Sequence, residues 1–524
     1  MILLACVLHL GVRMCTIGTH GFDHDEAVTW GMTRSLRNVI PLAITDCHPP
    51  LFAILETLWT GLFGKSEAAF RSLSMVFSLL LFLLLALSIR DAQRSNRTWA
   101  IGAVALVFCL LPYDIFFSRY ARNYTMMVFL CSLFSYLFFR LVVFSERKYF
   151  PHVVLAGILA LYTNNVSLLC IGAALAAGVL AKPNRANLFT AVKLALILAV
   201  VCVPWAIVMP IQIAHTRTAV DMFKQSNLWS ITEAPIGKFL ALLNPYPSGL
   251  DGPGYGETYS GFIAAPDDLL GWLGLSLVIL ALGAILINLG KIVRNDSVRP
   301  FLFQIAIIVV FMALNPMPVF SQKTVYIFVF PLVLLLGYSL SELMQTKAKL
   351  FSIAFLVCFV AVSLCGFPHQ NRGPDWKSLC ADVTHAWAKA RSPSLLISPA
   401  NEVLCLEYCI SRGYLKPLNP VWMSLNLIVT LVPPFDRELK LNMVTEGNYL
   451  GWSLDEKALC SVVSRIQDAE PGTTDIFYLR EGLGNLNLEW LNEKVVYWTT
   501  SRKRFGSYAL YHLERRIPEA GPNG

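Results

Sequence analysis

Residues suited to acid–base and phosphate chemistry gather in the loop after the first apolar block. Asp25 and Glu26 come first, and Asp46 and His48 follow further along, directly before Pro49. A carboxylate beside a membrane can accept a proton from a hydroxyl group, and an imidazole can neutralise a phosphate. The alternative is a solvated loop with no catalytic role, because polar groups at a membrane face cost little.

A second polar segment, Ser118 to Tyr124, lies between two later apolar blocks and contains Arg119 and Arg122. A guanidinium group matches the geometry of a phosphate, although an arginine at a hydrocarbon edge can also simply extend to the interface. Lys323, at the start of another block, offers a further cation, and the interfacial interpretation is the simpler one for it.

The elements that must position these residues are membrane helices. Of the 524 residues, 56% are hydrophobic and 15% are charged, against about 25% charged in ordinary soluble proteins. The apolar residues form blocks of roughly 18–23 residues, and only a helix satisfies its own backbone across a bilayer. We therefore predict about eleven spans, at 2–19, 67–89, 98–115, 124–144, 150–164, 165–181, 190–211, 268–290, 300–317, 323–343 and 350–367.

Lysine and arginine residues indicate the orientation of these spans. They gather in every second short loop, within 90–97, 140–148, 182–193, 291–299 and 347–349. The positive-inside rule makes these loops cytoplasmic. Both flanks of 150–181 are basic, so we interpret this stretch as a hairpin that turns at the polar residues 162–165. The loops 20–66 and 212–267 and everything after 367 then face outward.

The sequence pattern changes near residue 368. Trp376 to Ala390 and Leu459 to Ala469 are predicted helices, and 395–398, 476–479, 495–499 and 508–512 are predicted strands rich in β-branched and aromatic residues. We expect a mainly α protein with two domains: a transmembrane catalytic domain at 1–367, and a small α/β extracytoplasmic domain at 368–524. The net charge of +8 fits anionic lipid or phosphate, and no lysine or arginine run indicates a nucleic-acid partner.

Several motifs taken together resemble a known family. His24-Asp25-Glu26-Ala27, then Asp46-x-His48-Pro49-Pro50-Leu51, then Leu62-Phe63-Gly64, resemble the opening of bacterial family-39 glycosyltransferases of the GT-C fold. Relatives of that family are the protein O-mannosyltransferases and the lipid A aminoarabinose transferases. Later stretches, listed here in order, resemble family segments as well: 112–124, 161–163, 322–331 and 375–376. The resemblance covers essentially the whole chain and is weakest at 212–267 and at the C-terminal end.

The resemblance implies an inverting glycosyltransferase that moves a sugar from a polyprenyl-phosphate donor on the outer side of the membrane. Asp25 matches the catalytic aspartate, a general base, with Glu26 beside it. The remaining site residues are those expected at the donor phosphate, His48, Arg122, Arg119 and Lys323, and a possible further set, Asp46, Tyr124 and Asn164.

The chain departs from the family pattern at three positions. Tyr120 stands where the family usually has Glu, Asn164 where it has His, and Lys323 near the usual Arg. These departures bear on metal binding and on the acceptor more than on the reaction class. We expect no required metal; the alternative is a divalent ion held by oxygen ligands such as Asp23, Asp25 and Glu26. The expected acceptor is a lipid, a glycan or a protein, and the expected location is a bacterial inner membrane.

Two other classes of function compete with this hypothesis. A transporter or flippase of lipid-linked glycans needs ionisable residues near the middle of several helices, and the predicted spans hold few. A non-catalytic membrane scaffold gives no reason for carboxylates, histidine and arginine to share one face. The transferase is therefore the preferred prediction.

Overall fold

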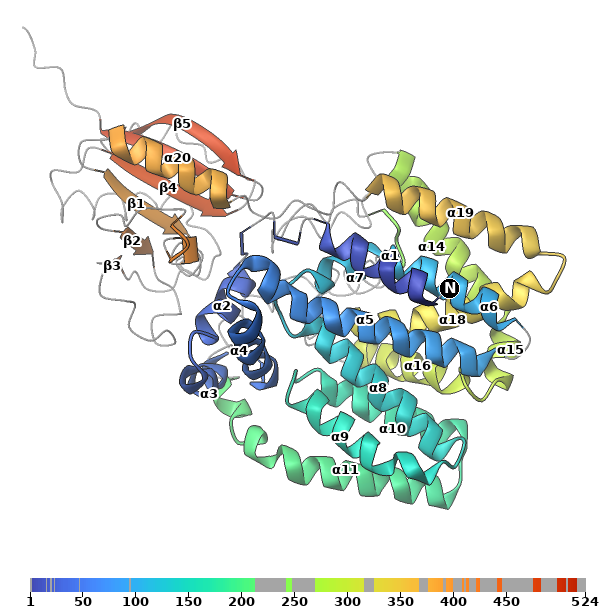
Figure 1. Cartoon of the computed structure of the whole chain (residues 1–524). Coiled ribbons are helices and arrows are strands. Elements are labelled where there is room, and N and C mark those ends of the chain that lie inside the picture. Colours follow the sequence, from blue (N-terminus) through green and yellow to red (C-terminus); the bar gives the residue numbers. More distant parts are fainter. Residues whose placement is uncertain are drawn as a thin grey trace, which may run out of the picture. The chain divides into compact units, whose positions relative to one another are not determined.

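The structure is a computed structural model of the whole chain (Figure 1). It describes residues 2–15, 17–18, 21–22, 24–46, 48–93, 96–212, 242–246, 269–314, 325–366, 376–389, 393–398, 408–409, 411–413, 421–424, 441–444, 475–481, 497–505 and 508–515. The chain forms two compact units. The first comprises Met1–Ile17, Met32–Leu250 and Tyr259–Asn371, and the second comprises Gly18–Gly31, Asp251–Thr258 and Arg372–Gly524.

The first unit is built of helices, and no strand occurs among its described residues. Its helices are α1 (Ile2–Met14), α3 (Leu36–Thr45), α4 (Leu51–Phe63), α5 (Glu67–Ala92), α6 (Arg97–Cys109), α7 (Pro112–Ser118), α8 (Tyr124–Val142), η1 (Arg147–Tyr149), α9 (Phe150–Leu161), α10 (Ser167–Ala181), α11 (Arg185–Ala206), α14 (Leu269–Ile287), α15 (Leu289–Arg294), α16 (Arg299–Leu314), η3 (Tyr326–Phe328), α18 (Val329–Met344) and α19 (Lys349–Gly366).

Helix starts follow from local sequence. Ser66 accepts a hydrogen bond from the Ala69 N–H at 3.2 Å and so caps α5. Asn184 does the same for α11, accepting from the Asn187 N–H at 2.8 Å. Each cap satisfies an N–H group that the first turn of a helix leaves without a backbone partner.

Several of these helices are candidate membrane spans. Among the described residues, five are long and apolar enough to cross a bilayer, or up to six if α6 and α7 are counted as one bent span. Shorter apolar helices stand at other predicted spans, among them α1, α10 and α19. The multiple apolar helices are consistent with an integral membrane protein.

Two of the apolar stretches predicted from the sequence contain a break between helices. The stretch 150–181 forms two helices, α9 and α10, with the break at Tyr162–Val166, so the predicted break in this stretch is confirmed. The span predicted as continuous at 98–115 is wrong in detail. It consists of α6 and α7, which are bent by 62° at Leu110 and Leu111. Pro112, which lacks an N–H and begins α7, is the physical reason for the break.

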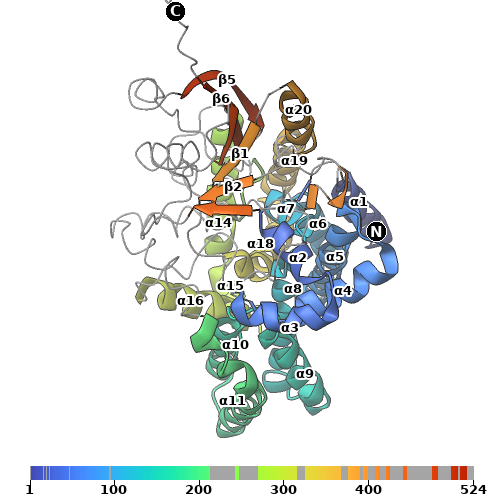
Figure 2. The ribbon, with the colours of Figure 1, turned by 90° about the vertical axis from the view of Figure 1, so that its left-hand side faces the viewer.

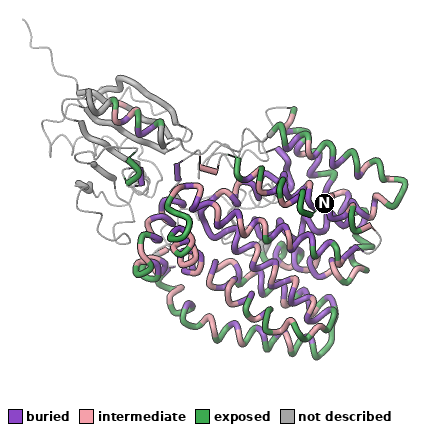
Figure 3. The backbone as a smooth tube through the Cα atoms, in the orientation of Figure 1, coloured by how far each residue is buried: buried purple, intermediate pink, exposed green. Residues whose placement is uncertain are grey.

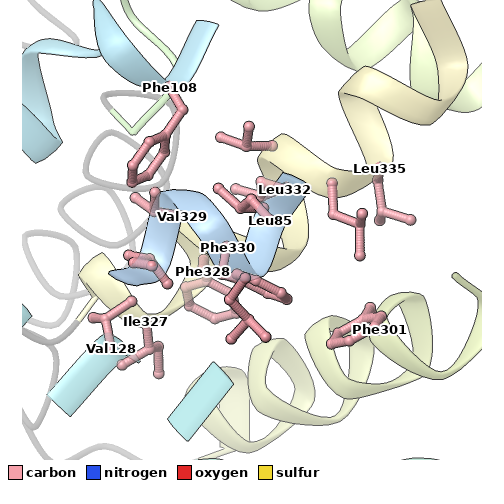
Figure 4. Close-up of a cluster of buried hydrophobic side chains, with 14 of the residues drawn as sticks. Leu85, Phe108, Val128, Phe301, Ile327, Phe328, Val329, Phe330, Leu332 and Leu335 are labelled. Carbon is pink, nitrogen blue, oxygen red and sulfur yellow. The ribbon is translucent and has the colours of Figure 1, made fainter. Parts of the chain in front are cut away.

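The core of the first unit lies around α18. Figure 4 shows Phe328, Val329 and Leu332 among side chains contributed by other helices, including Leu85 of α5, Val128 of α8 and Phe301 of α16. In contrast, α11 exposes large apolar side chains over several turns, among them Leu188, Leu196 and Val203 (Figure 3). An apolar face of this length, exposed within the described part of the chain, is what a helix presents to lipid.

The second unit contains α20 (Trp376–Lys389), a six-stranded sheet and all but the last residue of α2 (His24–Met32). The strands are β1 (Pro393–Ser398), β2 (Val421–Ser424), β3 (Leu441–Val444), β4 (Asp475–Glu481), β5 (Tyr497–Phe505) and β6 (Tyr508–Arg515), in the order β3-β2-β1-β4-β6-β5. The first four are parallel; β6 pairs antiparallel with β4 and with β5, and the β5–β6 ribbon is visible in Figure 2.

Four of these strands and α20 overlap the elements that the sequence predicts after residue 368. The predicted helix at 459–469 lies outside the described residues. An aromatic contact links the early segment of this unit to its later part: the Tyr408 ring lies 4.4 Å from the Phe22 ring and 5.4 Å from the Trp30 ring, centroid to centroid. Residues 18–31 thus pack with residues that follow 372, although the sequence alone assigns them to an outer loop of the transmembrane domain.

Candidate functional site

Three segments that are far apart in the sequence meet in the first unit: the stretch 46–50 before α4, the stretch 119–124 before α8, and the turn 162–166 between α9 and α10. The Leu51 N–H, at the start of α4, donates to the Tyr162 carbonyl at 3.0 Å. The buried Asn123 side chain donates to the Thr163 carbonyl at 2.8 Å. The turn between α9 and α10 therefore holds the other two segments, and we call the polar groups around it the turn cluster.

His48 belongs to the turn cluster. Its Nδ1 lies 3.4 Å from the Asn164 amide nitrogen, and its ring meets the Tyr124 ring edge-on at 5.9 Å between centroids. An amide nitrogen can only donate, so Nδ1 is the acceptor and the proton of a neutral His48 ring sits on Nε2. An Nε2–H group is a suitable donor for a phosphate oxygen.

Arg122 is the cation of the same cluster. Its guanidinium nitrogen Nη1 lies 3.8 Å from Asp46 Oδ2, and the two side chains are 7% and 17% exposed. The Arg122 backbone is fixed separately, because its carbonyl accepts a hydrogen bond from the buried Ser74 hydroxyl of α5 at 3.1 Å. The structure thus brings together five predicted site residues: Asp46, His48, Arg122, Tyr124 and Asn164.

Gln212 completes the cluster, and the sequence analysis missed it. Its amide nitrogen donates to the Ala43 carbonyl at 2.8 Å and to the Asp46 carbonyl at 2.7 Å. Its amide oxygen lies 3.4 Å from the Asn165 amide nitrogen. Gln212 therefore joins the C-terminal end of α3 to the turn between α9 and α10. A polar residue just beyond the apolar block of α11 was the available signal.

Arg119 lies beside the C-terminal end of α1. Its Nη1 donates to the Cys15 carbonyl at 3.2 Å, and Arg71 of α5 donates to the Ile17 carbonyl at 2.9 Å. Burial, and then the neighbouring positive charges of Arg13 and Arg71, lower the pKa of Arg119 to about 10. Arg119 therefore keeps its charge at neutral pH, as phosphate binding requires.

An apolar groove is lined in part by Cys15, whose carbonyl Arg119 binds. It has a volume of about 360 Å³ and runs between α1, the α6–α7 break and α19. Its lining includes Val7, Gly11 and Cys15 of α1, together with Ile115 and Leu364. Because Cys15 also carries the carbonyl that Arg119 binds, the groove has hydrocarbon walls and a cation beside one of its lining residues.

The predicted catalytic pair is described within the second unit. Asp25 and Glu26 stand in the first turn of α2, where Asp25 is half-buried and Glu26 is buried. The Asp25 carbonyl accepts a hydrogen bond from the Thr29 hydroxyl at 3.2 Å, one turn further along the same helix. Lys323 and Asp23 lie outside the described residues.

In the described part of the chain, no group of three or more His, Cys, Asp or Glu side chains is arranged to hold a metal ion. The ligand set suggested from the sequence includes Asp23, which that part does not contain.

The chain has a GT-C-like fold. The chain is similar to the crystal structure of ArnT from Cupriavidus metallidurans bound to undecaprenyl phosphate, with a TM-score of 0.56 and 11% identity over 99% of this chain and 98% of that one. It is also similar to the Archaeoglobus fulgidus oligosaccharyltransferase in complex with zinc and sulfate, with a TM-score of 0.52 and 12% identity over 91% of this chain and 67% of that one.

A further similar structure is the archaeal oligosaccharyltransferase AglB from Archaeoglobus fulgidus with an inhibitory peptide and a dolichol phosphate. Its TM-score is 0.50, with 11% identity over 91% of this chain and 68% of that one. No protein-family model and no curated protein matches the sequence. At such low identity, the similarity shows a GT-C-like fold, and function must be argued from the site.

Proposed function

We propose that the protein is an inverting membrane glycosyltransferase that takes a sugar from a polyprenyl-phosphate donor. The turn cluster carries this proposal. It gathers a guanidinium group, an imidazole and amide side chains from three separate segments, which is a set of groups suited to an anionic phosphate. The GT-C-like fold supports the same class, since structures of that fold have been determined with undecaprenyl phosphate and with dolichol phosphate.

The donor's phosphate would interact with Arg122 and with the Nε2–H group of His48, with Arg119 and Lys323 as further cations. The apolar groove beside Arg119 supports a lipid-linked donor, because one end of such a molecule is a hydrocarbon chain and the other is an anion. In the proposed reaction, the bond between the anomeric carbon and the phosphate oxygen breaks, and the phosphate keeps the electron pair. Cations held in place before the reaction stabilise that developing charge.

The general base is proposed from the sequence. Asp25 would accept the proton of the acceptor hydroxyl as its oxygen attacks the anomeric carbon from the opposite side, so the configuration inverts. Glu26 would contribute charge beside it. No general acid is required, because the leaving phosphate is already a stable anion. The reaction would take place on the outer side of a bacterial inner membrane, with a lipid, glycan or protein as acceptor.

The test compares cells that lack the gene with cells that carry variants of it. Mass spectrometry of lipid-linked sugars and surface glycans should reveal one sugar that disappears from the glycans upon deletion, while its lipid-linked form accumulates. The wild-type gene should restore the glycan and Asp25→Asn should not, because losing a general base typically costs about 10²-fold or more in rate.

A matched carboxylate outside the site serves as the control. Asp296→Asn removes an acid whose side chain is 59% exposed and which, among the described residues, forms an ion pair with the nearby Arg299. It should restore the glycan as fully as the wild type, at equal protein levels. Full restoration by Asp25→Asn would refute the assignment of the base. A glycan and lipid profile unaffected by deletion would refute the transferase itself.

A further inference from the structure

A separate polar group lies inside the apolar core of the first unit. Arg13 of α1 and Asp114 of α7 are both fully buried and form an ion pair. Ser78 of α5 donates to Asp114 Oδ2 at 2.7 Å, and the Tyr326 hydroxyl of η3 donates to Asp114 Oδ1. A buried charge that lacks partners costs several kcal/mol, so partners from four segments have to be in place together.

Arg13 also binds the broken backbone between α6 and α7. Its Nη1 donates to the Cys109 carbonyl at 3.1 Å, and its Nη2 lies 3.4 Å from the Phe108 carbonyl. The Phe108 carbonyl also accepts a hydrogen bond from the Leu111 N–H at 3.3 Å. The Cys109 carbonyl lies in the last turn of α6, where a helix leaves acceptors without intrahelical donors, and Pro112 brings no N–H group to it. In the hydrocarbon region no water can satisfy this carbonyl either. The Arg13 guanidinium group therefore neutralises the Asp114 carboxylate and also donates hydrogen bonds to the backbone at the break.

The break determines where the following segment goes. After the 62° bend, α7 leads directly to Arg119 and then to Arg122. The other end of the group is Tyr326 of η3. The Tyr326 ring also stacks on Phe117 of α7, with 4.8 Å between centroids. The buried group thus ties η3 to the helix that leads to the cations assigned to the donor phosphate.

We propose that Arg13, Asp114 and Tyr326 are positioning residues for donor binding: they fix the α6–α7 bend and hold η3 against it, so that the segment of Arg119–Arg122 is presented in one arrangement. This inference rests on the proposed function. It assigns no chemistry to the three residues, which would act through the geometry of the cations.

The decisive variant removes both charges together. Arg13→Met with Asp114→Leu replaces the pair by apolar side chains, a change that often preserves folding where single removals do not. The dissociation constant for undecaprenyl phosphate in lipid nanodiscs should rise about tenfold or more, because small displacements of binding groups are costly. Amide hydrogen exchange within 112–124 should become faster. For the donor that supports transfer, KM should rise while kcat changes little.

A second ion pair provides the matched control. Lys291→Met with Glu342→Leu removes a pair joined at 2.8 Å that has no part in the α6–α7 break. This control should leave both the dissociation constant and the exchange of 112–124 at wild-type values. If the Arg13 and Asp114 double variant matched the wild type in both measurements, the positioning role would be refuted.

Tyr326→Phe decides the question if the double variant does not fold. The substitution keeps the ring and removes only the hydroxyl group that donates to Asp114. We therefore expect a rise of about two- to fivefold in the dissociation constant for undecaprenyl phosphate, and faster amide exchange in 112–124. Wild-type values for both would equally refute the proposal. A wild-type protein that neither binds undecaprenyl phosphate nor transfers a sugar would refute the proposed function instead, while exchange would still report on the bend.

Discussion

Arg122 and Asp46 make opposite contributions to the charge of the turn cluster. Their closest atoms are 3.8 Å apart, so the carboxylate lies near the guanidinium group at more than an ordinary hydrogen-bond length. A carboxylate in that place opposes the binding of a second anion. Substitutions that remove the charge of Arg122 or of Asp46 should therefore change the affinity for a phosphate in opposite directions.

Arg122→Gln should weaken the binding of undecaprenyl phosphate about tenfold, because it removes a charge-assisted interaction. Asp46→Asn should strengthen that binding by about two- to tenfold, since it removes the competing charge and keeps the shape of the side chain. Titration in nanodiscs at low ionic strength measures both, and 1 M salt should reduce the two effects. A change in the same direction for the two variants would contradict a phosphate site at Arg122.

The sequence indicates the types of residue in this cluster but not their partners. Asp46, His48, Arg122, Tyr124 and Asn164 were chosen because of their chemistry at loop positions and their resemblance to family motifs. That Asn164 contacts His48, or that Asn123 binds the Thr163 carbonyl, depends on how separate helices pack. No spacing along one chain specifies such contacts. The prediction that Asp25 acts together with this cluster, by contrast, stays a prediction.

At the scale of elements, Gln212 shows how one side chain joins a helix end to a turn. Gln212→Ala would leave the Ala43 and Asp46 carbonyls without that donor, at a cost of about 1–3 kcal/mol in the free energy of unfolding. The loop that carries Asp46 and His48 would lose its connection to the turn cluster. We therefore expect a lower melting temperature together with a weaker affinity for undecaprenyl phosphate.

Gln304 is a suitable control for this prediction. It is also buried, and its amide nitrogen lies 3.0 Å from the Ser135 hydroxyl and 3.3 Å from the Cys170 carbonyl, between helices. Gln304→Ala should lower the melting temperature to a similar extent and leave the affinity unchanged. Equal losses of affinity in both variants would mean that Gln212 acts through stability alone.

Helices were the predictable elements because each apolar block satisfies its own backbone and needs no partner to be recognised. The break between α6 and α7 was not predicted, since 98–115 is apolar from end to end apart from Asp114. Pro112 and Asp114 were the signals inside that block, and Arg13 was the signal inside the first one. A charge within a span requires a partner, so two such residues in different blocks could have been paired as a hypothesis.

At the scale of the whole molecule, the proposed chemistry depends on which side of the membrane each loop faces. Basic residues lie in every second short loop, and this pattern needs an even number of crossings between the basic flanks of 150–181, which α9 and α10 would supply if each crosses the membrane. The stretch 212–267 and everything after 367 should then be outside, on the same side as the loop of Asp25. Alkaline phosphatase and green fluorescent protein, fused after Gly256 or after Pro368, measure this directly.

Both fusions should give active alkaline phosphatase and no green fluorescence, because each enzyme or fluorophore matures on only one side of the membrane. A fusion after Arg185, within the basic loop between α10 and α11, is the control and should give the reverse result. The two test fusions share every span up to α11, so an error in the early topology would invert both together. A cytoplasmic signal after Pro368 alone would instead place an odd number of crossings between 257 and 368. In that case the residues after 372 would lie on the side opposite the 212–267 stretch, which would contradict the predicted topology.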